Sequence, residues 1–247
     1  MTEHTVRSFG EELELLADEV ARMGGLAEYM VTASLDAVAS RDATLARAVV
    51  ERDRRLDQMQ RELERQAVRL IALRQPLAQD LRDTVAALKV SNNLERIGDL
   101  AKNIAKRSLE LTDLERTTLS RSLERMGRNV AGLLKDVLDA YAKADADAAK
   151  RVWLRDEEID ERYNALFREL LTYMMEDPRK IGIGANLLFM AKNLERIGDH
   201  ATNVAEVVYY RVTGDELPAE RPRGPSAIPG MMTEAYTDNT ADDEPEA

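Results

Sequence analysis

The sequence predicts an all-α protein made of two tandem antiparallel three-helix bundles, followed by a disordered acidic tail. Apolar residues recur at intervals of three and four along most of the chain, and no segment shows the period-two alternation of a strand. Gly and Pro are sparse before residue 213, which suits long helices. The string Asn-Leu-Glu-Arg-Ile-Gly-Asp occurs at 93–99 and again at 193–199. A repeat of this length indicates an internal duplication with an offset of 100 residues.

Local signals divide residues 1–213 into six helices of about 30 residues, each about 45 Å long at 1.5 Å per residue. Aspartate caps a helix N-terminus, proline disfavours helical dihedrals in the residue before it, and glycine ends a helix. The predicted break points are, in order, Asp42, Pro76, the pair Thr112-Asp113, Asp145, the pair Asp177-Pro178, and Gly214. Asp42 is expected to cap the second helix and Asp145 to open the fifth.

The 100-residue offset groups these helices as three plus three. Short connections favour antiparallel neighbours, so the expected domains are 1–111 and 112–213. The remaining segment, 214–247, contains five of the seven prolines, nine acidic residues and two basic ones. It carries −7 of the total charge of −11, which leaves −4 for residues 1–213. Such a segment buries too little apolar surface to fold, so we expect a disordered, solvating tail.

Composition excludes several classes of function. The chain has no cysteine, which removes disulfides, thiolate metal sites and cysteine nucleophiles. An acidic body with 4% aromatic residues argues against nucleic-acid binding. The N-terminal residues do not resemble a signal peptide, and no run approaches 18 apolar residues. The expected location is the cytoplasm.

The duplicated string places two carboxylates four residues apart in each copy, Glu95 with Asp99 and Glu195 with Asp199. In a helix this spacing puts both groups on one face, here opposite the apolar stripe. A solvated surface is the simplest interpretation of such a face. Two features favour a functional interpretation of this face, because each is unfavourable for a helix and occurs in both copies. Like charges at i and i+4 repel each other, and a glycine, Gly98 or Gly198, lies within each helix. Such a glycine indicates that something approaches the backbone closely.

A second pair of carboxylates occurs in the preceding helix of each half. Asp53 and Asp57 correspond to Asp156 and Asp160, again four residues apart. If the two helices bring their pairs together, four negative charges converge and require a cation, and oxygen ligands suit hard metal ions. The chain has only two histidines, so imidazole cannot complete both sites. His200 has no counterpart in the first half and is expected to be a surface residue rather than a ligand.

These residues resemble the PhoU family. The resemblance covers about residues 1–213 and is carried by both copies of Leu-Glu-Arg-Ile-Gly-Asp and by Arg74-Gln75-Pro76 leading into Asp80-Leu81-Arg82. It implies a PhoU-like fold of two three-helix bundles with iron or zinc clusters, one per half. The implied first-site ligands are Asp53, Asp57, Glu95 and Asp99, and the implied second-site ligands are Asp156, Asp160, Glu195 and Asp199. Asn103 and Asn203 are weaker candidates at the continuation of the same face.

The resemblance also implies a function. PhoU-like proteins are negative regulators of phosphate uptake and of the phosphate-starvation response, not enzymes. They link the ATPase subunit of the phosphate ABC transporter to a PhoR-type sensor histidine kinase, and so lie at the membrane only through their partners. A homodimer is left open. Two alternatives remain: a structural helical adaptor without metal, and a carboxylate-metal hydrolase, for which no base or nucleophile is visible beyond the ligands.

Overall fold

A computed structural model describes residues 2–110 and 118–218, with side chains from residue 10 onward in the first range and from residue 119 onward in the second. All regular secondary structure in these ranges is helical, so the predicted fold class is confirmed. The predicted boundary at Thr112-Asp113 and most of the predicted tail, 219–247, lie outside the described residues. The helices are α1 (Thr2–Ser40), α2 (Ala43–Arg74), α3 (Ala78–Ser108), α4 (Thr118–Lys143), α5 (Ala146–Leu154), α6 (Asp156–Glu176), the 3-10 helix η1 (Pro178–Lys180) and α7 (Ile181–Thr213).

Most of the predicted helix ends are confirmed. The Asp42 carboxylate accepts hydrogen bonds from the backbone N–H groups of Thr44 and Leu45, at 2.8 and 3.0 Å, and so caps α2. The Asp145 carboxylate accepts one from the N–H of Ala148 at 2.8 Å and caps α5. Pro76 lies in the connection between α2 and α3. Gly214 ends α7 with a φ of 81°, a conformation in which a side chain would be strained.

The prediction of a single fifth helix between Asp145 and Asp177 is wrong. The structure has two helices in this region, α5 and α6, which meet at Arg155. The Arg155 N–H donates to the carbonyl of Val152 at 3.0 Å, which closes a tight final turn on α5. Asp156, Glu157 and Glu158 then form the first turn of α6. Three acidic residues are favourable at a helix N-terminus, where the helix dipole is positive, but have no such benefit inside a long helix. The break therefore places Asp156 at a helix start.

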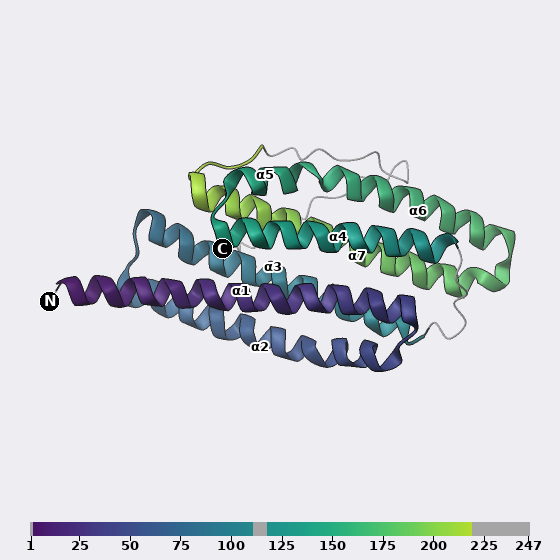
Figure 1. Ribbon diagram of the computed structural model, residues 1–247, viewed down its shortest axis with the longest axis horizontal. Helices are drawn as coiled ribbons and strands as arrows, with labels where there is room; N and C mark the ends of the chain where they lie inside the picture. Colours follow the sequence, from purple (N-terminus) through teal and green to yellow (C-terminus); the bar gives the residue numbers. More distant parts are fainter. Residues whose placement is uncertain (1, 111–117, 219–247) are drawn as a thin grey trace, which may run out of the picture.

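The helices form two bundles that lie side by side (Figure 1). Helices α1, α2 and α3 pack on one another, as do α4 to α7, and α3 and α7 make the main contact between the halves. One continuous core runs through both bundles. Its largest fully buried side chains are Met23, Met30, Leu56, Leu63, Leu94, Ile97, Ile104, Leu123, Met126, Leu133, Leu134 and Leu170. The apolar stripes predicted for α2, α3 and α7 supply much of this core.

An arginine joins the two halves at each end of the α3–α7 contact. At one end Arg211 of α7 donates to the Asp83 carboxylate at 2.7 Å and to the Tyr141 carbonyl at 3.1 Å. At the other end Arg107 of α3 donates to Asn186 at 3.0 Å and stacks over the ring of Phe189. The two helices are therefore antiparallel, with their ends fixed by charge-assisted hydrogen bonds.

The two mid-helix glycines explain how the carboxylate-bearing helices come close together. A Cβ atom added to Gly98 would overlap the Cδ2 of Leu56 in α2, and one added to Gly198 would lie 3.2 Å from the Cγ2 of Ile159 in α6. Leu56 is flanked by Asp53 and Asp57. The group that approaches the glycine backbone is thus an apolar side chain of the preceding carboxylate-bearing helix. Its close packing brings the two pairs of acidic residues to the same place.

Replacing Gly98 with alanine should lower the free energy of unfolding by about 1–3 kcal/mol, because the overlap with the fully buried Leu56 outweighs the helix propensity of alanine. The matched control is Gly132 of α4, where an added Cβ meets nothing within 4 Å. Gly132→Ala should stabilise the protein by up to about 1 kcal/mol. Urea unfolding of both variants checks the two signs. Equal stabilisation at both positions would contradict this packing role for Gly98.

In the part of the chain that the structure describes, no helix is both long enough and apolar enough to cross a membrane.

Candidate functional site: two carboxylate clusters

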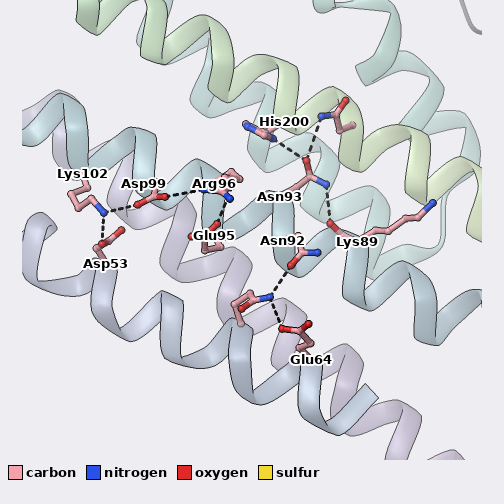
Figure 2. Close-up of polar contacts among 12 residues, drawn as sticks. Asp53, Glu64, Lys89, Asn92, Asn93, Glu95, Arg96, Asp99, Lys102 and His200 are labelled. Atoms are coloured by element: carbon pink, nitrogen blue, oxygen red, sulfur yellow. Dashed lines mark hydrogen bonds and ion pairs between the residues drawn. The ribbon is translucent and has the colours of Figure 1, made fainter. Parts of the chain in front are cut away.

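The first-half cluster is built around a lysine. Lys102 of α3 extends its ammonium between two aspartates, 2.6 Å from Oδ2 of Asp53 in α2 and 2.5 Å from Oδ1 of Asp99 in α3 (Figure 2). The Asp53 side chain is only 8% exposed and that of Lys102 18%. The predicted convergence of the α2 and α3 carboxylates is therefore real, but the cation between Asp53 and Asp99 belongs to the protein.

A second cation lies on the solvent side of this cluster. The Arg96 guanidinium is 3.5 Å from both the Glu95 and the Asp99 carboxylates, and its side chain is 63% exposed. Burial raises the pKa of Glu95, Arg96 opposes that rise, and the neighbouring Asp99, Asp57 and Asp53 add to it. All four predicted first-half residues therefore lie within electrostatic reach of one another.

Burial also governs the charges at the centre of the first cluster. It raises the pKa of Asp53, and the hydrogen bond and charge of Lys102 only partly oppose it. Burial pulls the pKa of Lys102 down, but the hydrogen bonds and charges of Asp53 and Asp99 outweigh it, so the net pKa is raised. The ammonium therefore stays charged at neutral pH. The Oδ1 atom of Asp53 is buried and accepts no hydrogen bond from the residues that the structure describes.

The second-half cluster contains the equivalent carboxylates but a different set of partners. Position 202, which the repeat aligns with Lys102, is a fully buried threonine. Its hydroxyl lies 3.0 Å from Oδ1 of Asp156 and 3.1 Å from the Gly198 carbonyl. The Lys192 ammonium lies 2.6 Å from Oε1 of Glu195 in this cluster. The position that an ammonium fills in the first half thus carries a neutral hydroxyl in the second.

The Asp199 carboxylate has a strongly raised pKa. Burial raises its pKa to about 7, with further rises from the charges of Glu195, Asp156 and Asp160 and a small opposing effect of Lys192. The Oε2 atom of Glu195 is also buried without a hydrogen-bond partner in the described part of the chain. The four carboxylates of the second half therefore lie within electrostatic reach of one another. Their oxygen atoms are donors of the type that hard divalent ions prefer.

The remaining candidates lie elsewhere. Asn203 and His200 face the other half, where the Asn93 amide oxygen is 3.4 Å from the amide nitrogen of Asn203. The same oxygen is 3.0 Å from Nδ1 of His200 (Figure 2). His200 is therefore a half-buried residue of the α3–α7 contact. That it is not a metal ligand stays a prediction. Asn103 is exposed. A ligand role for either asparagine stays a prediction.

As the side chains lie within residues 10–110 and 119–218, no three His, Asp or Glu residues are arranged to hold one metal ion. Sequence reasoning also missed the residues that distinguish the two clusters, Lys102, Thr202 and Lys192. The signal was present, because alignment of the repeats pairs Lys102 with Thr202 and Asn92 with Lys192. Comparing the differences between the two copies, and not only their identities, would have found it.

The fold and these clusters define a class: duplicated, all-helical proteins with an acidic cluster between two helices of each half. A family model described as the PhoU domain matches this chain twice, over residues 20–108 and 123–208. The chain belongs to the PhoU family.

Relatives and solved structures agree with this assignment. A "phosphate-specific transport system accessory protein PhoU homolog" of Caulobacter vibrioides is 62% identical over 224 residues, which cover 90% of this chain and 97% of that protein. A homolog of the same name from Zymomonas mobilis is 49% identical over 90% of this chain and 93% of its own length. The crystal structure of PhoU from Pseudomonas aeruginosa superposes with a TM-score of 0.81 at 40% identity, and covers 84% of this chain and 100% of that one.

Proposed function

We propose that this chain is an accessory protein of phosphate-specific transport that restrains phosphate uptake and represses the phosphate-starvation response when phosphate is plentiful. The observation that carries this proposal is the 62% identity, over nearly the full length of both chains, to a protein named for that role. The chain would act in the cytoplasm between the ATPase subunit of the phosphate ABC transporter and a PhoR-type sensor kinase. Its long helices offer wide faces on which partner proteins can dock.

We further propose that the second-half cluster binds a metal ion through carboxylate oxygens of Asp156, Asp160, Glu195 and Asp199. The orphaned Oε2 atom of Glu195 and the raised pKa of Asp199 support this, because a bound cation would satisfy both. A bound ion would supply positive charge that lets the four acidic residues stay ionised together. The family resemblance favours iron or zinc, and the oxygen ligands are also suited to other divalent ions. Side-chain rotation would have to precede chelation.

A metal-free helical adaptor is the second candidate, and one observation favours it. No preformed chelating group occurs among the described side chains. Elemental analysis of the purified chain, before and after loading with iron, zinc or manganese salts, separates the two candidates. We expect bound metal in the wild type and its loss in Asp199→Ala combined with Glu195→Ala. A wild-type protein that stays metal-free after loading would favour the adaptor.

The regulatory role is tested in a strain in which this gene is the only member of its family. Deleting the gene should raise alkaline phosphatase expression in high-phosphate medium, and a plasmid copy of the wild type should restore repression. Unchanged expression in the deletion strain would contradict the repressor role. The double variant of Asp199 and Glu195, expressed from the same plasmid, shows whether repression requires the proposed metal site.

A further inference from the structure

We propose that the C-terminal segment 224–247 binds in a groove between α1 and α2 of its own chain. This inference rests neither on the proposed function nor on a metal site. The groove has a volume of about 620 Å³, and its apolar side chains are Leu15, Leu16, Leu70 and Leu73. Leu15 is 58% exposed and Leu73 67%. Exposed apolar side chains gathered in a groove indicate a binding surface.

The charges around this groove suit an acidic segment. Its charged side chains are Arg22, Arg69 and Arg74 together with Glu12 and Glu19. Each glutamate is paired with an arginine, because Arg74 lies 2.8 Å from Glu12 and Arg22 lies 2.6 Å from Glu19. Arg69 is exposed at the edge of the groove. The lining is therefore positive by one charge, on a chain whose net charge is −11.

An exposed row of arginines leads away from the groove along α2. Arg61, Arg65 and Arg69 follow one another at intervals of four residues, which places them on one side of the helix. Glu62 and Glu64 flank this row. The apolar floor of the groove is thus followed, toward the start of α2, by a surface on which arginine side chains are exposed.

The terminal segment carries the complementary chemistry in the same order. Segment 224–247 contains six acidic residues and no basic one. Its larger apolar residues come first, at Ile228, Met231, Met232 and Tyr236. Five acidic residues follow them, at Asp238, Asp242, Asp243, Glu244 and Glu246. With its apolar part on the leucines, the segment would direct its acidic part toward the arginines of α2. A segment with too little apolar surface to fold by itself can bind to a surface that supplies it.

The end of α7 brings the segment close to the groove. The start of α1, the connection from α2 to α3 and the end of α7 lie at the same end of the molecule (Figure 1). The Arg211 carbonyl of α7 accepts a hydrogen bond from the Gln79 side chain of α3 at 3.0 Å. Gln79 is five residues from Arg74, a span of at most about 18 Å. The ten residues from Pro218 to Ile228 span up to about 33 Å, so the apolar part of the segment reaches the groove. Because a tether gives an effective concentration on the order of millimolar, a weak contact is sufficient.

The rate at which a thiol in the groove is labelled tests the inference in the full-length chain. Because the chain has no cysteine, Gln66→Cys introduces a single thiol at an exposed position of the groove. Its reaction with a neutral maleimide is compared between the natural segment and a variant that combines Ile228→Ser, Met231→Ser, Met232→Ser and Tyr236→Ser. We expect the serine variant to be labelled about fivefold faster, as for a groove that the tethered segment covers about four-fifths of the time. Ala165→Cys, at an exposed residue of α6, is the matched control and should be labelled equally fast with either segment.

Cross-linking tests the contact itself. Met232→Cys combined with Gln66→Cys should give a bismaleimide cross-link within one chain, whereas Met232→Cys combined with Ala165→Cys should not. NaCl at about 1 M, where the Debye length is about 3 Å, should reduce the cross-link by screening the acidic residues from the arginines. Equal labelling of Gln66→Cys with the natural and the serine segment would overturn the inference, as would equal cross-linking at the two sites. Cross-links between chains that disappear on dilution would assign the groove to a second copy of the chain and would also overturn it.

Discussion

Replacing Lys102 with methionine should lower the free energy of unfolding of the metal-free protein at pH 8 by about 3–5 kcal/mol, the usual result of removing one partner of a buried ion pair. Methionine preserves most of the side-chain length and packing but leaves Asp53, which is 8% exposed, without its counter-ion. Because burial raises the pKa of Asp53, lowering the pH should protonate this aspartate and reduce the cost of the substitution.

Urea unfolding in EDTA at pH 8 and at pH 4.5 measures both effects. Lys106→Met is the matched control, since Lys106 lies on the same helix and is exposed. Substitutions of exposed residues of this kind usually change stability by less than about 0.5 kcal/mol. A Lys102 variant as stable as the Lys106 variant would show that the first cluster does not depend on its lysine.

The same substitution at the two copies of one repeat position should have opposite effects. At pH 8 without metal, Asp199→Asn should raise the free energy of unfolding by about 2–4 kcal/mol, because one pKa unit corresponds to about 1.4 kcal/mol. The folded-state pKa of Asp199, at about 7, lies above its ordinary value of 3.8. The stability linked to its protonated form is therefore fully present below about pH 4 and is lost as the pH rises through 7. Asparagine stays neutral and does not show this loss.

Asp99→Asn should instead destabilise the protein by about 1–3 kcal/mol, because it weakens the pairing of Asp99 with Lys102 and Arg96. Unfolding curves for both variants and the wild type from pH 4 to pH 8.5 check the signs. The gain from Asp199→Asn should disappear near pH 4. A gain independent of pH, or a loss at both positions, would contradict the raised pKa of Asp199.

Much of the fold follows from local patterns in the sequence. The spacing of apolar residues predicts the helices. Asp42 and Asp145 cap helix N-termini and Gly214 ends a helix, as the preferences of these residue types predict. The break at Arg155 could not be predicted in the same way, because the apolar positions continue through Val152 and Ile159 on either side of it. It depends on one tight turn and on three acidic residues whose benefit comes from the helix dipole.

The candidate site was predictable to a lesser degree. Spacing predicts that Glu95 and Asp99 share a face and that the α2 aspartates converge on them, which the structure shows. An amphipathic pattern predicts that residues opposite the apolar stripe of a helix are exposed to solvent. The structure instead buries Asp53 and Asp156 between helices. It also cannot show that the side chain of Lys102 crosses from its own helix to Asp53. Such long-range contacts depend on helix packing, which Gly98 controls through Leu56.

The two duplicated clusters differ at one equivalent position, where Lys102 joins Asp53 to Asp99 in the first half and Thr202 donates to Asp156 in the second. Anomalous diffraction from crystals of the full-length protein soaked in Mn²⁺ tests this most directly. We predict an anomalous peak among Asp156, Asp160, Glu195 and Asp199, with the Lys102 ammonium still between Asp53 and Asp99. A peak between Asp53 and Asp99, with the lysine displaced, would contradict it.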